Sequence, residues 1–170
     1  PWLVCINHAA QWDALVTAEM FLPRQTSFTA KSSLFHHKAM NWTITALGAI
    51  PVRRGEADTS AIKKALNALE EGRVFALFPE GTRNLKQDGS IGQLHTGAGL
   101  IAMKAKVPVL PIYIHHGGKY RFLHPFTIYM GQPVELSDLM GKRINNSLLE
   151  EVMDRIYQEM MRLKKIAEKG

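Results

Sequence analysis

The sequence contains a single cysteine and no hydrophobic stretch long enough to span a bilayer. Cys5 alone excludes an internal disulfide framework, and the low cysteine content suits a reducing compartment. A membrane-spanning helix needs about 18 consecutive apolar residues, and no apolar run reaches that length. Because the chain begins at Pro1 with a short apolar run and no basic leader, we expect that an upstream, membrane-associating segment has been removed.

Acidic residues are in the minority. Asp and Glu number 15 against 21 Lys and Arg, which gives a net charge of +6 at pH 7. This charge favours an anionic partner, which could be nucleic acid, an anionic membrane surface or a phosphorylated substrate. No helix-turn-helix, zinc-finger or aromatic ribonucleoprotein motif accompanies the basic residues, so we expect no nucleic-acid partner.

The composition is that of a globular chain, with 46% hydrophobic and 21% charged residues over 170 positions. We expect residues 1–170 to form one domain. Short apolar or β-branched runs alternate with longer segments of helical period, which predicts an α/β fold with a largely parallel β-sheet flanked by helices. The expected strands are residues 3–6, 27–30, 49–52, 74–78, 109–114 and 127–130.

Two segments have clear helical periodicity. Residues 59–71 place Ile62, Ala65, Leu66 and Leu69 on one face, with Asp58 or Thr59 as the cap. Residues 147–168 place Leu149, Val152, Ile156, Met160 and Leu163 on one stripe. The second helix either docks on the sheet or lies in a membrane surface, since an amphipathic stripe fits both arrangements.

A histidine and an aspartate follow the first expected strand. His8 and Asp13 are five positions apart, and on one continuous helix they would point about 140° apart at ~100° per residue. They can meet only if His8 precedes the helix and Asp13 lies in its first turns. A neutral imidazole could then accept the proton of an attacking hydroxyl while the carboxylate fixes its tautomer. The alternative is a histidine that caps or packs against the helix.

Two adjacent arginines, Arg53 and Arg54, follow the third expected strand. Their guanidinium groups match phosphate oxygens, so they either bind a substrate phosphate or form a solvated surface pair.

Residues 78–84, Phe-Pro-Glu-Gly-Thr-Arg-Asn, follow the fourth strand. Glu80 and Arg83 could form a plain surface ion pair, but Gly81 permits close backbone approach, and Thr82 with Arg83 supplies donors for a phosphate or hydroxyl.

Residues 107–114 form an apolar run that contains two prolines. Proline is disfavoured inside a central strand, so Pro108 and Pro111 predict a sheet edge, a bulge or the start of a strand. Taken alone, this run is typical of a strand in the hydrophobic core.

In this order and spacing, four segments resemble the four motifs of the glycerolipid acyltransferase family. They are residues 7–13, 48–54, 78–83 and 107–111, and the resemblance covers about residues 3–133. The stretch 96–102 also resembles the family. A match of four motifs in order is far more specific than any one of them.

The resemblance implies a glycerol-3-phosphate acyltransferase-like fold. It also implies transfer of a fatty acyl group from acyl-CoA or an acyl carrier protein to the free hydroxyl of 1-acylglycerol 3-phosphate, giving phosphatidic acid. His8 would be the general base, and Asp13 would orient it. The implied substrate-binding residues are Arg53, Arg54, Glu80, Gly81, Thr82 and Arg83, and the implied acyl-pocket residues are Val107, Pro108 and Pro111. No metal or bound cofactor is implied, since backbone donors and cationic side chains can stabilise an oxyanion.

The same resemblance implies a peripheral position on the cytoplasmic face of a bacterial inner membrane. Its partners would be a lysophospholipid acceptor, an acyl thioester donor and the anionic membrane surface. Ala10 and Asn84 stand where the family commonly has serine, which leaves the acceptor open. The alternatives are another acceptor, either glycerol 3-phosphate or another lysophospholipid, and a non-catalytic lipid-binding membrane protein.

Two further features do not predict chemistry. Cys5 lies inside an apolar strand, so we expect a buried, inert thiol. The pairs His36-His37 and His115-His116 would point to opposite faces of a strand, and no carboxylate or cysteine lies nearby at ligand spacing, so we expect no metal site.

Overall fold

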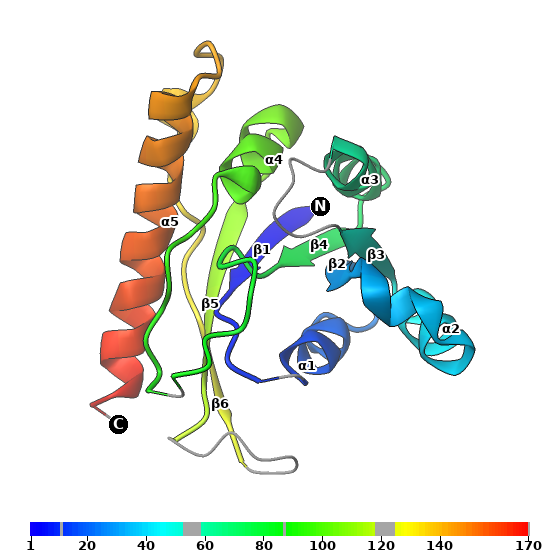
Figure 1. Ribbon diagram of the computed structural model, residues 1–170. Helices are drawn as coiled ribbons and strands as arrows, with labels where there is room; N and C mark the ends of the chain where they lie inside the picture. Colours follow the sequence, from blue (N-terminus) through cyan, green and yellow to red (C-terminus); the bar gives the residue numbers. More distant parts are fainter. Residues whose placement is uncertain (11, 53–58, 87, 118–124, 170) are drawn as a thin grey trace.

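A computed structural model describes residues 1–10, 12–52, 59–86, 88–117 and 125–169 (Figure 1). Its strands are β1 (Trp2–Ile6), β2 (Thr26–Lys31), β3 (Ala49–Val52), β4 (Val74–Leu77), β5 (Val109–His115) and β6 (Thr127–Met130). They form one sheet in the order β3-β2-β4-β1-β5-β6, in which only β6 is antiparallel to its neighbour. The predicted α/β fold with a largely parallel sheet is therefore confirmed.

Helices cover both faces of this sheet. They are α1 (Asp13–Met20), α2 (Lys38–Ala46), α3 (Thr59–Glu70), α4 (Gly97–Ala105) and α5 (Asn146–Ala167), with short 3-10 turns η1 (Ser32–His36) and η2 (Ser137–Leu139). Residues of α3, α4 and α5 share one hydrophobic cluster with the sheet, whereas α1 and α2 contribute to the cluster on the other face. Figure 1 shows α5 lying along β5, on the opposite side of the sheet from α1. Among the described residues, no helix has the length and apolar character needed to cross a bilayer.

Strand β1 lies at the centre of the sheet and is buried on both faces. Leu3 and Cys5 pack on the side of α3 to α5, and Val4 and Ile6 pack on the other side. This explains the continuous apolar run, which is typical of a parallel strand covered by helices on both faces. Cys5 is completely buried, as predicted, and this burial raises the pKa of its thiol to about 12, which disfavours the reactive thiolate.

Helix α5 docks on the sheet, and the alternative of a membrane-lying helix is not needed. All five residues of the predicted stripe are buried, namely Leu149, Val152, Ile156, Met160 and Leu163. The helix begins with an N-cap in which the Asn145 side chain accepts a hydrogen bond from the Leu148 N–H at 2.8 Å.

Pro111 corrects one expectation. It lies inside β5, which is an interior strand between β1 and β6, so the predicted sheet edge or strand start is wrong for this residue. A bulge is present in the opposing segment, because β5 advances three residues between positions 109 and 112 while its partner advances four, from 130 to 134. There the Gly131 N–H donates to the Pro111 carbonyl at 2.9 Å, and a Cβ on Gly131 would lie 2.8 Å from the proline ring. A glycine at the bulge therefore accommodates the proline.

Candidate functional site

Three neighbouring parallel strands have their carboxyl ends along the same edge of the sheet, which is called the carboxyl edge. β1 ends at Ile6, β4 ends at Leu77 and β5 ends at His115. Because β4 and β5 flank β1 in parallel, the segments that follow these strands lie together at this edge. Asn7 fixes their alignment, since its side chain accepts from the Ile114 N–H at 2.7 Å and donates to the Ile114 carbonyl at 3.1 Å.

The structure brings His8 and Asp13 together in the turn between β1 and α1. Asp13 is the first residue of α1, and its Oδ2 lies 3.1 Å from His8 Nδ1. The same oxygen accepts the backbone N–H groups of Ala9 and Ala10, both at 2.8 Å. An ionised carboxylate has no proton to donate, so Nδ1 of His8 carries a proton, and in the neutral imidazole Nε2 then has the lone pair. This is the tautomer that a general base requires.

Asp13 is held in its ionised form despite complete burial. Burial alone would raise its pKa, but the hydrogen bonds from His116, His8, Ala10 and Ala9 outweigh that effect and hold the pKa below its usual value. Asp13 is therefore a hydrogen-bond acceptor that orients His8, and its lowered pKa favours leaving the Nδ1 proton on the imidazole.

The loop after β4 holds the backbone of His8. The Glu80 carboxylate accepts the His8 N–H at 2.9 Å and the Gly92 N–H at 2.8 Å. The Asn84 N–H donates to the His8 carbonyl at 2.8 Å, and the Phe78 ring stacks on the imidazole with centroids 4.1 Å apart. Both oxygens of Glu80 are thus used by the protein's own main chain, which assigns this residue to holding His8 in place. Burial raises the Glu80 pKa, although the two backbone hydrogen bonds oppose that effect.

The other predicted substrate-binding residues lie in this loop or outside the described residues. Gly81 has φ +66°, and a Cβ there would lie 2.9 Å from the His95 ring, so the turn requires glycine. Thr82 is exposed and Arg83 is half-buried. Among the described residues, Arg83 has no carboxylate partner. Arg53 and Arg54 fall outside the described residues.

The predicted acyl-pocket residues do not gather around His8. Val107 is buried in the core and Pro108 is exposed, and both precede β5 at the opposite edge of the sheet. Even the first residue of β5 pairs with Leu3, five residues before His8, which is roughly 16 Å along the strand. Pro111 lies in mid-strand opposite Cys5.

Sequence spacing does not reveal the third member of the buried cluster, His116. Its Nε2 lies 3.0 Å from Asp13 Oδ1, and the two residues are 103 positions apart in the chain. The sequence has no carboxylate at ligand spacing from the 115–116 pair, and the fold brings Asp13 to His116 because β5 lies beside β1. The available sequence signal for His116 is its position at the end of an expected strand, where it can meet residues that follow a neighbouring strand. Within the described ranges, no group of three or more His, Cys, Asp or Glu residues could hold a metal ion.

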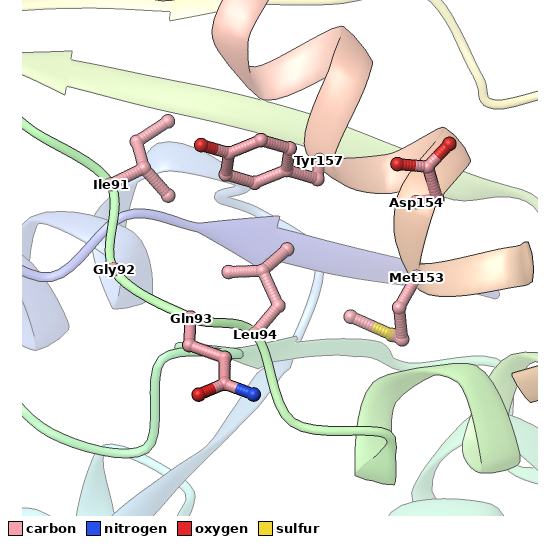
Figure 2. A pocket seen from close by; sticks show the side chains of 7 residues that line it. All are labelled: Ile91, Gly92, Gln93, Leu94, Met153, Asp154 and Tyr157. Atoms are coloured by element: carbon pink, nitrogen blue, oxygen red, sulfur yellow. The ribbon is translucent and has the colours of Figure 1, made fainter. Parts of the chain in front are cut away.

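A separate open groove lies between the loop and α5 (Figure 2). It has a volume of about 320 Å³ and is lined by Ile91, Gly92, Gln93, Leu94, Met153, Asp154 and Tyr157. Neither His8 nor Asp13 lines it. Gly92 connects it to the site through its hydrogen bond to Glu80. The chemistry at the sheet edge and this groove are therefore distinct features.

Comparison with known proteins decides the family. The family model for acyltransferases matches residues 1–115 of the chain. The chain belongs to the acyltransferase family. The predicted resemblance to this family is thereby confirmed, and the matched residues include His8 and Asp13.

Individual relatives agree with this family. The chain is 30% identical to a 1-acyl-sn-glycerol-3-phosphate acyltransferase of Streptococcus pneumoniae over 95% of its length, but it spans only 60% of that relative. It is 28% identical to a protein of the same name from Bacillus subtilis, over 81% of the chain and 68% of the relative. The crystal structure of the 1-acyl-sn-glycerophosphate (LPA) acyltransferase PlsC from Thermotoga maritima superposes with a TM-score of 0.69 at 25% identity, covering 98% of this chain and 66% of that one.

Proposed function

We propose that this acyltransferase moves a fatty acyl group from acyl-CoA or an acyl carrier protein to the free hydroxyl of 1-acylglycerol 3-phosphate. The observation that carries the proposal is the buried Asp13 carboxylate that orients His8 at the carboxyl edge of the sheet. The names of the S. pneumoniae and B. subtilis relatives support this acceptor.

The His8 geometry supports direct transfer between the two substrates. His8 Nε2 accepts the proton of the acceptor hydroxyl as its oxygen attacks the thioester carbonyl. The tetrahedral intermediate then collapses, the C–S bond breaks, and the thiolate leaving group takes the proton from His8. The acyl group ends as an ester of the acceptor, and no acyl-enzyme forms. Asp13 stabilises the imidazolium between these steps.

Thr82 and Arg83 are the described residues best suited to the acceptor phosphate. They directly precede Asn84, whose N–H is bonded to the His8 carbonyl, and this proximity in the chain supports the assignment. Arg83 offers an uncompensated guanidinium among the described residues, and Thr82 offers a hydroxyl. We assign phosphate binding to these two residues, with Arg53 and Arg54 as further candidates on sequence grounds alone.

A matrix of donors and acceptors tests the proposal. The purified protein is assayed with acyl-CoA and with acyl carrier protein thioester, each against 1-acylglycerol 3-phosphate, glycerol 3-phosphate and lysophospholipids with larger head groups. The highest kcat/KM is expected with 1-acylglycerol 3-phosphate. Preference for another acceptor would replace the substrate assignment, and binding of lipid vesicles without any transfer would favour a non-catalytic lipid-binding protein.

We also propose peripheral attachment to an anionic membrane, on the cytoplasmic face of a bacterial inner membrane. The net charge of +6 supports electrostatic attraction to anionic lipids. Vesicle binding should weaken as salt rises, because the Debye length falls from ~10 Å at 0.1 M to ~3 Å at 1 M ionic strength. Binding that is insensitive to salt would contradict electrostatic attachment and indicate hydrophobic insertion.

A further inference from the structure

We propose that His116 is a positioning residue for proton transfer, which acts by holding the second carboxylate oxygen of Asp13. The inference rests on the proposed function, since it concerns the group that orients the general base. It adds a buried histidine that directly follows β5 to a pair that comes entirely from the β1–α1 turn.

The two oxygens of Asp13 have separate partners. Oδ2 accepts from His8 Nδ1 and from two backbone N–H groups, whereas Oδ1 lies 3.0 Å from Nε2 of His116. Because Asp13 is ionised, the proton in this second contact belongs to His116, and its Nε2–H is the donor. His116 is 4% exposed and Asp13 is 0% exposed, so water does not replace this donor.

The location of His116 relative to Asp13 is fixed by the sheet. His116 directly follows β5, and β5 pairs with β1 in parallel register. Asn7 locks the two strand ends together through both backbone groups of Ile114. The His116 ring also lies 6.1 Å from the Phe126 ring, at a tilt of 49°. The imidazole therefore contacts both the carboxylate and an aromatic ring.

The contact has a defined consequence for His8. Without it, Oδ1 would be a buried carboxylate oxygen lacking its donor, and the carboxylate would either rotate towards a new partner or attract the His8 proton more strongly. The described titratable groups around Asp13 are His8, His116 and Glu80. Of these, only the two histidines donate to the carboxylate, and Glu80 adds a negative charge that the loss of His116 leaves unchanged.

The test compares His116→Leu, which removes the donor, with His116→Gln, whose side-chain amide can reach the position of Nε2. In His116→Leu we expect kcat to fall on the order of 10- to 100-fold with an unchanged acceptor KM. We also expect the acidic limb of its pH profile to move to higher pH, because Asp13 then favours the protonated imidazole. His116→Gln should recover activity to within about threefold of the wild type.

The neighbouring His115→Leu is the matched control and should leave kcat and the pH profile unchanged, since His115 has no contact with Asp13 in the described structure. If His116→Leu does not fold, His116→Asn takes its place, because its shorter amide cannot reach Oδ1, and the same losses are expected. An unchanged kcat and pH profile in the donor-deficient variant would overturn the role of His116. So would an equal loss in the Leu and Gln variants without a shift in the profile.

Wild type and His8→Ala are measured in parallel to separate this inference from the proposed function. If wild type is active, His8→Ala is inactive and His116→Leu is unaffected, only the positioning role of His116 is rejected. The proposed function then still holds. Full activity in His8→Ala would overturn both.

Discussion

The two halves of the candidate site are built very differently. On the proton-transfer side, Asp13 is completely buried, each of its oxygens has a partner, and the His8 backbone is held by Glu80 and Asn84. On the side assigned to the acceptor, Thr82 is exposed and Arg83 is only half-buried. On the proton-transfer side, the polar groups are paired with other groups of the protein. On the acceptor side, the Thr82 and Arg83 side chains are accessible for binding a ligand.

This difference separates chemistry from selectivity. A base that is oriented before substrate arrives needs little reorganisation during the reaction, which is how preorganised sites lower barriers. Exposed donors on a loop can accommodate different head groups without disturbing the base. Substitutions on the proton-transfer side should therefore affect kcat or stability, and those on the acceptor side should affect KM.

Asp13→Asn should have the largest effect of the substitutions that probe this comparison. The amide cannot accept hydrogen bonds through both of its terminal atoms, so the His8 tautomer is no longer fixed, and kcat should fall on the order of 10³-fold or more. Steady-state kinetics with saturating donor and acceptor measure the effect. Asp154→Asn, an exposed change on α5, is the control and should behave as wild type. A near-normal kcat in Asp13→Asn would contradict the claim that the proton-transfer side depends on an oriented His8.

The lowered pKa of Asp13 also predicts an acid-dependent loss of stability. A carboxyl group whose pKa is lower in the folded state contributes stability that is present above the unfolded pKa of ~3.9 and is lost as pH falls through the folded pKa. The free energy of unfolding, measured in urea at neutral and acidic pH, should show a gap between wild type and Asp13→Asn that narrows in acid. A gap that widens in acid would contradict the ionised Asp13.

Glu80→Ala should cost stability as well as activity. It leaves the buried N–H of His8 and the part-buried N–H of Gly92 without their acceptor, which should lower the free energy of unfolding by about 2 kcal/mol. Urea unfolding at neutral pH checks this value. Glu71→Ala, which removes an exposed ion pair with Arg73, is the matched control and should change little. If Glu80→Ala instead raised only the acceptor KM, Glu80 would belong to the acceptor side.

Arg83→Ala should produce the smallest change and the one most specific to substrate. Loss of a charged hydrogen bond to phosphate should raise the acceptor KM about 10-fold, with kcat, thioester KM and unfolding free energy nearly unchanged. Arg143→Ala, an exposed arginine before α5, is the control. Equal changes in the acceptor KM and the thioester KM would remove the phosphate assignment.

Local patterns in the sequence predict most of the fold. Each expected strand is present to within one residue at either end. The signal is clearest for β1 and β4, because parallel strands buried on both faces appear as short apolar runs bounded by turn residues. The stripe on α5 is equally clear. Pro111 misleads because the bulge that accommodates it is set by Gly131 on another segment, and no local pattern links the two.

The candidate site divides in the same way. His8 and Asp13 are close in sequence, so a turn before a helix suffices to predict their contact. His116 comes from a strand whose place beside β1 depends on the order of the whole sheet. Glu80 is chemically suited to a substrate hydroxyl, and only the structure shows that backbone groups already use both of its oxygens.

The central claim is that His8 is the base around which this edge of the sheet is organised. Its most direct measurement is the rate of acyl transfer by His8→Ala at saturating donor and acceptor, alongside the exposed control His37→Ala. A loss of at least ~10²-fold in His8→Ala, with unchanged acceptor binding and an unaffected control, is the predicted result. Turnover by His8→Ala at the wild-type rate would contradict the account.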